Sequence, residues 1–251
     1  MIKKDKILNL ILPIVTIGCI LLIWSVMAIV VDSEYILPTV AQTFSVLINL
    51  FADGEFYLAF SLTLLRSLIA FAFSFIIASS CALISHRSKR AERVVLTVIS
   101  ILRALPTIAI VLLLLFWTNS QIAPVIVTML VVLPTIYTHV KSAFESVDKT
   151  SVEAGLVDGA GKFQSFIKVE LPQIAPAIYS AIGSGVSLNF KLMVAAEVLS
   201  ATIRSLGGLL NDAKYSFQMA NMLAMVIIAI IFGVVIEFIF NKISHKSANW
   251  R

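Results

Sequence analysis

Six apolar stretches follow one another along the chain, and each is long enough to cross a membrane. A spanning helix needs about 20 predominantly apolar residues. The stretches occupy residues 8–31, 57–84, 94–117, 122–140, 173–190 and 219–240. This pattern predicts an all-α membrane protein, a polytopic bundle of about six transmembrane helices that forms one transmembrane domain over residues 1–251.

Two of the connections carry a helical pattern of their own. After Pro38 and Thr39, apolar residues recur on one face up to Phe51, which predicts either an amphipathic helix lying at the outer membrane interface or a loop packed on neighbouring helices. Residues 150–172 form a polar island. Thr150 and Glu153 have the spacing of a capping box, so we expect a short helix from Ser151.

The polar island also has signals that end helices. Two glycines, Gly159 and Gly161, should end the first helix, and a second amphipathic piece over 162–170 should stop where Pro172 cannot continue the backbone hydrogen bonds. Residues 150–172 therefore predict a helix-turn-helix outside the bilayer. Prolines also fall within the spans, at positions 106, 124 and 134, where we expect bends or breaks, and Gly183 and Gly185 predict close helix packing.

Composition and charge agree with a membrane protein and give its orientation. The chain is 59% hydrophobic and 13% charged, far from the proportions of soluble domains. With a cytoplasmic N-terminus, fourteen of the nineteen basic residues lie in connections on the inner side, whereas Lys191, Arg204 and Lys214 lie on the outer side. The positive-inside rule then places both termini and residues 150–172 in the cytoplasm. Because the basic residues are spread over four connections, no nucleic-acid partner is expected.

The polar island resembles the EAA loop of bacterial ATP-binding-cassette (ABC) importer permeases, in the branch that includes nitrate, sulfonate and taurine permeases. The resemblance rests on Glu153-Ala154, Gly159 and Leu171-Pro172 at the family's spacing, although Gly155 stands where alanine is usual. It implies a type I ABC importer-like permease fold in which this loop is the coupling helix that engages an ATPase. The residues that it assigns to ATPase coupling are Glu153, Ala154, Gly155, Asp158, Gly159, Leu171 and Pro172.

The same resemblance implies the partners and the localisation. They are a dimer of ABC ATPase subunits, an extracytoplasmic substrate-binding protein, and a second permease copy, most simply in a homodimer within the bacterial cell membrane. The chain itself is then a transport subunit and not an enzyme. It would bind no cofactor, since ATP and Mg²⁺ belong to the ATPase. Indeed Gly159-Ala160-Gly161-Lys162 lacks the glycine and the hydroxyl residue that a phosphate-binding loop needs.

Polar residues in or next to the spans are candidates for the solute path. These are Arg66, Arg103, Asn189, Lys191 and Glu197. An arginine within a span is costly and should face the bundle interior or a cavity, so Arg66 and Arg103 either line the path or are structural anchors bonded to helix carbonyls. Glu197 either pairs with Arg204, two helical turns on, or takes part in gating.

The nature of the cargo is the least constrained inference. A sulfonate, nitrate or taurine-like anion is the usual cargo of the branch and is compatible with the basic candidates, while a vitamin precursor or other heterocycle is the alternative. An ion-coupled secondary transporter would need intramembrane ionisable residues, for which we find only Arg66, Arg103 and Glu237. A multi-span membrane enzyme would need a catalytic constellation, which the sequence does not contain.

Overall fold

The computed structural model describes residues 2–157, 159 and 161–248, with side chains for all of these except 2–11, 149, 155, 156, 162 and 248. The described residues form helices and connections without a β-strand. The chain divides into two compact units, and each is described by itself. One comprises the residues up to Tyr57 with Leu209–Ile228, and the other comprises Leu58–Gly208 with the residues from Ala229.

The smaller unit is built on helix α1 (Ile2–Val31) and the short helix α2 (Val40–Leu50), together with most of α10 (Leu206–Tyr215) and the start of α11 (Met219–Ala248). Thr39 caps α2 in a capping box with Gln42. The Trp24 indole N–H donates to the Pro38 carbonyl at 3.0 Å and ties α1 to the start of α2. The amphipathic helix expected after Thr39 is therefore present.

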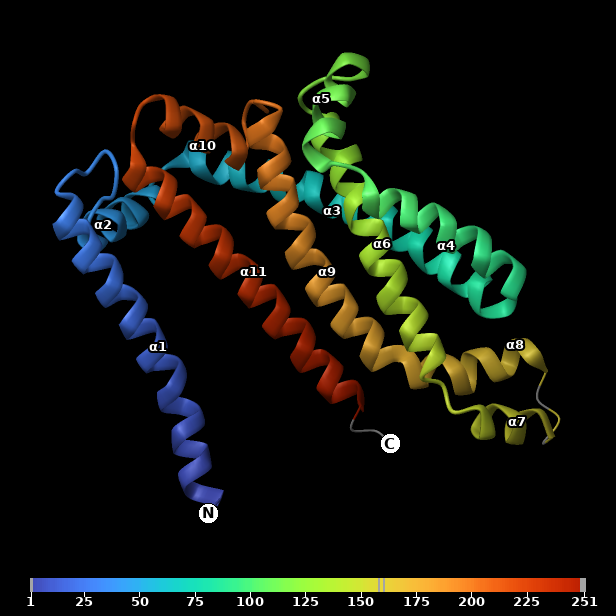
Figure 1. Cartoon of the computed structure of the whole chain (residues 1–251). Coiled ribbons are helices and arrows are strands. Elements are labelled where there is room, and N and C mark those ends of the chain that lie inside the picture. The colour runs from blue at the N-terminus through green and yellow to red at the C-terminus, as the bar shows by residue number, and fades with distance from the viewer. Residues whose placement is uncertain (1, 158, 160, 249–251) are drawn as a thin grey trace. The chain divides into compact units, whose positions relative to one another are not determined.

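The larger unit contains the other helices. They are α3 (Gly54–Arg87), α4 (Lys89–Ala104), α5 (Thr107–Trp117), α6 (Ala123–Glu145), α7 (Lys149–Val157), α8 (Lys162–Ser165), the π-helix η1 (Phe166–Glu170) and α9 (Leu171–Leu199), followed by the rest of α11. Helices α6 and α9 lie side by side at its centre, and α7 and α8 lie together at one end of this pair (Figure 1).

Among the described residues, five helices are long and apolar enough to cross a membrane, and a sixth span is possible if one bent pair of helices is counted. The expected third span is that pair. Helices α4 and α5 meet at 91°, because Pro106 has no backbone N–H to donate and keeps Leu105 in an extended conformation. The fifth span is the one most underestimated from the sequence: α9 runs to Leu199, well beyond residue 190.

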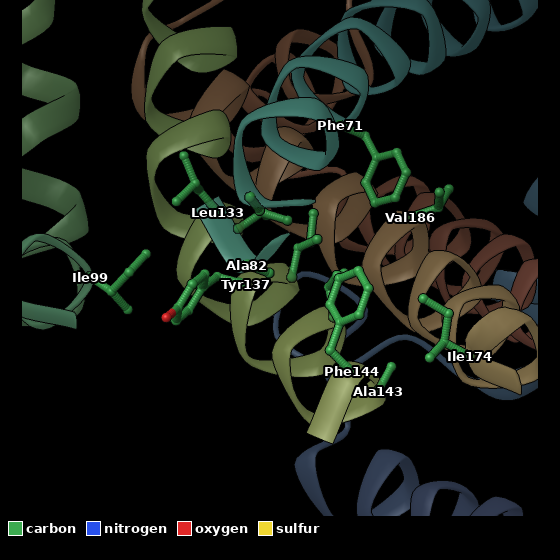
Figure 2. Packing of buried hydrophobic residues seen from close by; sticks show 13 residues of the cluster. Phe71, Ala82, Ile99, Leu133, Tyr137, Ala143, Phe144, Ile174 and Val186 are labelled. Carbon is green, nitrogen blue, oxygen red and sulfur yellow. The ribbon is translucent and has the colours of Figure 1, made fainter. Parts of the chain in front are cut away.

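The core of the larger unit lies where α3, α4, α6 and α9 meet. Its buried residues include Phe71, Ile99, Tyr137 and Ile174 (Figure 2). The hydroxyl of Tyr137, which is 1% exposed, bonds Ser85 Oγ at 3.0 Å, so the large ring can be buried without an unpaired polar atom. This core fixes the ends of α3 and α6 next to α7 and η1.

Small residues let α9 approach its neighbours closely, as the sequence predicts. A methyl group added at Gly183 would lie 2.5 Å from Phe240 Cβ of α11, and one added at Gly185 would lie 2.8 Å from the Phe71 ring. Pro124 lies in the first turn of α6 rather than at a break, while Pro134 lies within the same helix.

Candidate functional site

The first candidate region is the helix-turn-helix over residues 149–172. Helix α7 begins at Lys149, and its cap is Asp148: the backbone N–H groups of Thr150 and Ser151 donate to the Asp148 carboxylate at 3.1 and 3.2 Å, and the Ser151 hydroxyl donates at 2.5 Å. The expected capping box at Thr150 and Glu153 is therefore wrong. A carboxylate accepts several donors more readily than a threonine hydroxyl can, so the helix begins earlier.

The donors around Asp148 hold the pKa of its carboxyl below the usual range, with the Ser151 hydroxyl as the largest cause. A lowered pKa means that the charged cap stabilises the native loop at neutral pH. This contribution declines as the pH drops below the ordinary pKa of aspartate and is lost as the pH falls through the lowered value.

The turn after α7 depends on Gly159, as expected. Its φ is +86°, a conformation that side chains with a Cβ disfavour, while the space around it is open. The prediction that the second helix of this region stops at Pro172 is wrong. The helix over 162–170 does not stop at Pro172 but continues through the π-helix η1 into α9, and Pro172 lies in the first turn of α9, directly after the π-helical turn.

A pocket of about 420 Å³ lies between α7 and the ends of α3 and α6. Its lining includes His86, Arg87, Glu153 and Glu170. Glu170 is 5% exposed, with Arg87 at 3.6 Å and His86 at 3.8 Å from its carboxylate oxygens. The Phe166 ring stacks with the Phe144 ring. The Arg87 guanidinium lies over the Phe166 ring, 5.4 Å from its centroid. These contacts connect the helix-turn-helix to α3.

The residues assigned to ATPase coupling lie along this segment. Glu153 and Ala154 are exposed on α7, which also contains Gly155, and Leu171 is 44% exposed at the start of α9 beside Pro172. Asp158 lies outside the described residues. The exposed Phe163 adds an apolar group to the same segment. Residues of α7 such as Glu153 and Ala154 are therefore accessible to solvent, and the pocket next to α7 is lined by charged side chains.

The second candidate region surrounds Glu197, which is fully buried in α9. Its carboxylate accepts from Arg66 at 2.9 Å and from the Thr63 hydroxyl at 2.8 Å, and the Gly207 N–H donates to it at 3.3 Å. The expected pairing with Arg204 is wrong, because α9 ends at Leu199 and Arg204 lies in a turn at φ 50° rather than on the same helix face.

The partners of Glu197 join α9, α3 and the start of α10. Arg66 also donates to the amide oxygen of Gln121, and Gln121 donates to the Ile203 carbonyl at 3.2 Å. A Cβ at Gly207 would collide with Glu197, so only glycine fits at this position near the start of α10. Because Arg66 is 13% exposed and paired, it serves as an anchor in this arrangement.

The remaining candidates lie apart from each other. Arg103, on α4, donates to the Pro134 carbonyl at 3.4 Å and to the Thr138 hydroxyl on α6, as expected for an anchor bonded to helix carbonyls. Asn189 is buried and donates to the Ser67 carbonyl at 2.6 Å. Lys191 does not lie in an outer loop but inside α9, within 4.0 Å of Glu237 on α11.

Comparison with known proteins identifies the family. The family model described as "Binding-protein-dependent transport system inner membrane component" matches residues 70–247. The chain belongs to this family. It is a multi-pass membrane protein and the permease subunit of an ABC importer.

Two relatives illustrate how far the likeness extends. A protein of Methanocaldococcus jannaschii, named as an ABC transporter permease, is 25% identical over 99% of this chain and 93% of its own length. A protein of Escherichia coli, named as an aliphatic sulfonates transport permease, is 26% identical over 80% of this chain and 76% of its own length.

The fold is shared with solved transporters. An inward facing conformation of the MetNI methionine ABC transporter aligns with a TM-score of 0.63 at 18% identity, covering 74% of this chain and 93% of that chain. An amino acid ABC transporter crystallised with histidines gives a TM-score of 0.63 at 16% identity, covering 75% and 92%.

Several residues of these two regions were missed from the sequence. Glu170 was missed because its partners, His86 and Arg87 at the end of α3, are far away in the sequence. Thr63 and Gln121 also give no signal in the sequence, because each is one polar residue among many and its partner is far away along the chain.

Proposed function

We propose that residues 149–172 of this permease form the coupling helix that engages a separate ABC ATPase on the cytoplasmic side. The observation that supports it best is the short capped helix α7, which ends at a glycine turn and is followed by a helix continuous with the spanning helix α9. Movement of α7 would be transmitted directly into a span.

The mechanism follows from this connection. ATP binding closes two ATPase subunits and carries two coupling helices together, so two permease copies switch between inward-open and outward-open states. The chain itself is then not an enzyme and binds no cofactor, since ATP and Mg²⁺ stay on the ATPase. An external binding protein delivers the solute, and both termini lie in the cytoplasm, as the distribution of basic residues suggests.

For the cargo we propose a small sulfonate or a similar anion. Two relatives support this: the Escherichia coli protein and a Bacillus subtilis protein that is 23% identical over 97% of this chain, whose names both refer to aliphatic sulfonates. A heterocyclic compound is the second candidate, because a Chloroflexus aurantiacus protein named as a riboflavin transport permease is 24% identical over 51% of this chain.

The coupling role can be tested with two glycines of the same loop. Gly159→Val places a β-branched side chain at positive φ, which costs about 1–2 kcal/mol and distorts the turn after α7. Gly161→Val is the matched control, because Gly161 has equally open surroundings and no positive φ. We expect ATP hydrolysis stimulated by the binding protein to fall roughly tenfold for Gly159→Val and to be retained for Gly161→Val.

Two results would contradict the proposal. One is an equal effect of both substitutions on hydrolysis and on copurification of the ATPase. The other is labelling of a cysteine at Glu153 by an impermeant reagent from the external side of intact cells, because the coupling helix would then lie on the wrong side of the membrane.

A further inference from the structure

One carboxylate oxygen of Glu170 is buried without a hydrogen-bond donor. Glu170 lies at the end of η1 and is 5% exposed, and its Oε2 atom has no hydrogen-bond partner among the described residues. Two basic side chains at the end of α3 lie beyond hydrogen-bonding distance, with Arg87 3.6 Å from Oε1 and His86 3.8 Å from Oε2. Because a buried charged oxygen is normally hydrogen-bonded, this atom lacks a donor that its burial requires.

The imidazole of His86 is placed to supply that donor. Its ring stacks on the ring of Phe144, near the end of α6, with centroids 5.1 Å apart and ring planes at 23° (Figure 2 labels Phe144). Neither ring nitrogen makes a hydrogen bond to another described residue. The side chain is 30% exposed and lines the pocket of about 420 Å³ next to α7. The ring therefore has an aromatic support, access to solvent and an unpaired carboxylate oxygen nearby.

The charge of His86 decides whether it can bond Glu170 strongly. Histidine side chains usually gain or lose their proton between about pH 5 and 8. A neutral imidazole has one N–H and no charge, whereas the imidazolium donates from both nitrogens. A charge-assisted hydrogen bond to a carboxylate is about 2.7–2.9 Å long, so a movement of roughly 1 Å would close the present gap of 3.8 Å.

The other basic side chains that line the pocket have partners of their own. Arg87 lies beside the other carboxylate oxygen of Glu170. Lys89, at the start of α4, is paired with Glu92 at 3.1 Å. Neither is placed to satisfy Oε2, which leaves His86 as the basic side chain of the pocket that lies beside this atom.

The acidic side chains of the pocket come from three elements. Glu145 of α6 is 2.6 Å from Lys141, whereas Glu153 of α7 makes no ion pair with another described residue. A positive charge on His86 therefore meets a carboxylate on η1 and shares a pocket with an unpaired one on α7. Both carboxylates belong to the segment that contains the helix-turn-helix.

We infer that His86 is a positioning residue for coupling, and that its imidazolium donates a hydrogen bond to Glu170 Oε2 and holds the helix-turn-helix over residues 149–172 to the end of α3. The link is present while His86 carries its proton and is lost as the pH rises and the imidazole becomes neutral. This inference rests on the proposed function and adds to it a dependence of coupling on pH.

The link itself is tested by thermal unfolding of the detergent-solubilised permease at pH 6 and pH 8. The wild type is compared with His86→Gln, Glu170→Gln and the double variant, so that effects of each substitution alone cancel. At pH 6 we expect the two single losses in melting temperature to exceed the loss in the double variant by about 3 °C. At pH 8 the losses should add. Additive losses at both pH values, or the same excess at both, would overturn the inference.

The effect on coupling is tested with the permease and the ATPase reconstituted in nanodiscs. The measurement is the ratio of ATP hydrolysis with and without the binding protein, which corrects for the pH dependence of the ATPase alone. In the wild type this ratio should be roughly fivefold higher at pH 6 than at pH 8, the lower end of typical coupling energies. His86→Gln should remove the difference. His139→Gln is the matched control, because His139 lies exposed on α6 and should leave the difference unchanged.

A variant with a permanent charge separates the proton from the shape of the side chain. An arginine is always charged and can stack on an aromatic ring as His86 does on Phe144. We expect His86→Arg to keep at pH 8 the ratio that the wild type shows at pH 6. A ratio as low as that of His86→Gln at pH 8, or a wild-type pH dependence in His86→Gln, would overturn the inference. Copurification of the ATPase with each variant shows that the variant has folded.

The two experiments separate this inference from the proposed function. If the binding protein does not stimulate hydrolysis by the wild-type complex at either pH, the proposed function fails. If stimulation is present and equal at pH 6 and pH 8, only the role of His86 fails. The unfolding measurement needs neither the ATPase nor the binding protein, so it tests the link between His86 and Glu170 in either case.

Discussion

Single buried polar residues connect the helices of this permease. The Glu197 carboxylate accepts hydrogen bonds from two residues of α3, Thr63 and Arg66, and from the backbone N–H of Gly207 at the start of α10. A fully buried carboxylate is tolerated only when it is paired and hydrogen-bonded, and each of these partners meets part of that need. The arrangement therefore depends on every member being present.

Substitution of Glu197 by glutamine should destabilise the protein. The Arg66 guanidinium would lose its counter-charge while still largely buried, and removal of one partner of a buried pair typically costs about 3–5 kcal/mol. The measurement is thermal unfolding of the detergent-solubilised protein. Glu237→Gln is the control, because that carboxylate is 42% exposed and should have a much smaller effect. Equal melting temperatures for the two variants would show that the Glu197 pair does not stabilise the fold.

The sequence could predict the types of these residues but not their partners. The arginine at position 66 was expected to face the interior, and it does, yet its partner is 131 residues away and no spacing rule reaches that far. The same reasoning explains the error over Arg204. The interval of seven residues counts as two helical turns only if one helix continues across it, and the chain turns after Leu199 instead.

At the scale of helices, the π-helix η1 joins the helix-turn-helix over residues 149–172 to the spanning helix α9. Phe166–Glu170 is a π-helix between α8 and α9, and Glu170 at its end contacts Arg87 and His86 from α3. Single π turns inside helices are frequent at functional sites. This element therefore has two connections to the membrane part, one through the backbone into α9 and one through charge to α3.

We expect Glu170→Gln to weaken the transmission of movement rather than binding of the ATPase. The substitution keeps the size of the side chain but removes its attraction to Arg87, so α7 and α3 can move independently. Solute transported per ATP hydrolysed should fall by roughly fivefold or more, the lower end of typical coupling energies. The control is Glu145→Gln, since that carboxylate is 56% exposed and pairs only with Lys141 among the described residues. A ratio equal to that of wild type for both variants would remove Glu170 from the coupling path.

Helix boundaries show where sequence patterns lose precision. The apolar pattern located all the spanning segments, and Pro106 located the break between α4 and α5. The pattern failed at Asp148, where a carboxylate just before the helix caps it, and at Pro172, where the π-helix η1 lets the helix continue. The short helix α10 was not predicted, because two adjacent glycines, Gly207 and Gly208, disfavour a helix unless they pack closely, as these do against Glu197 and Thr202.

At the scale of the whole molecule, each copy has one helix-turn-helix, over residues 149–172, for which we propose the role of coupling helix. The family assigns such permeases to transport systems with ATPase and binding-protein partners and implies a dimer. We expect a homodimer, because one coupling helix engages one ATPase and two ATPase subunits close together.

This expectation can be measured on the purified complex. When the permease is expressed in two differently tagged forms, each tag should recover the other form together with the ATPase, and native mass spectrometry should give two permease copies for two ATPase copies. A second, different permease chain recovered in equal amount would contradict the homodimer while leaving the coupling proposal intact. Recovery of the permease with one tag only and no ATPase would contradict both. Closed two-fold assemblies are the commonest arrangement of identical subunits, which is why the homodimer is the arrangement that we expect.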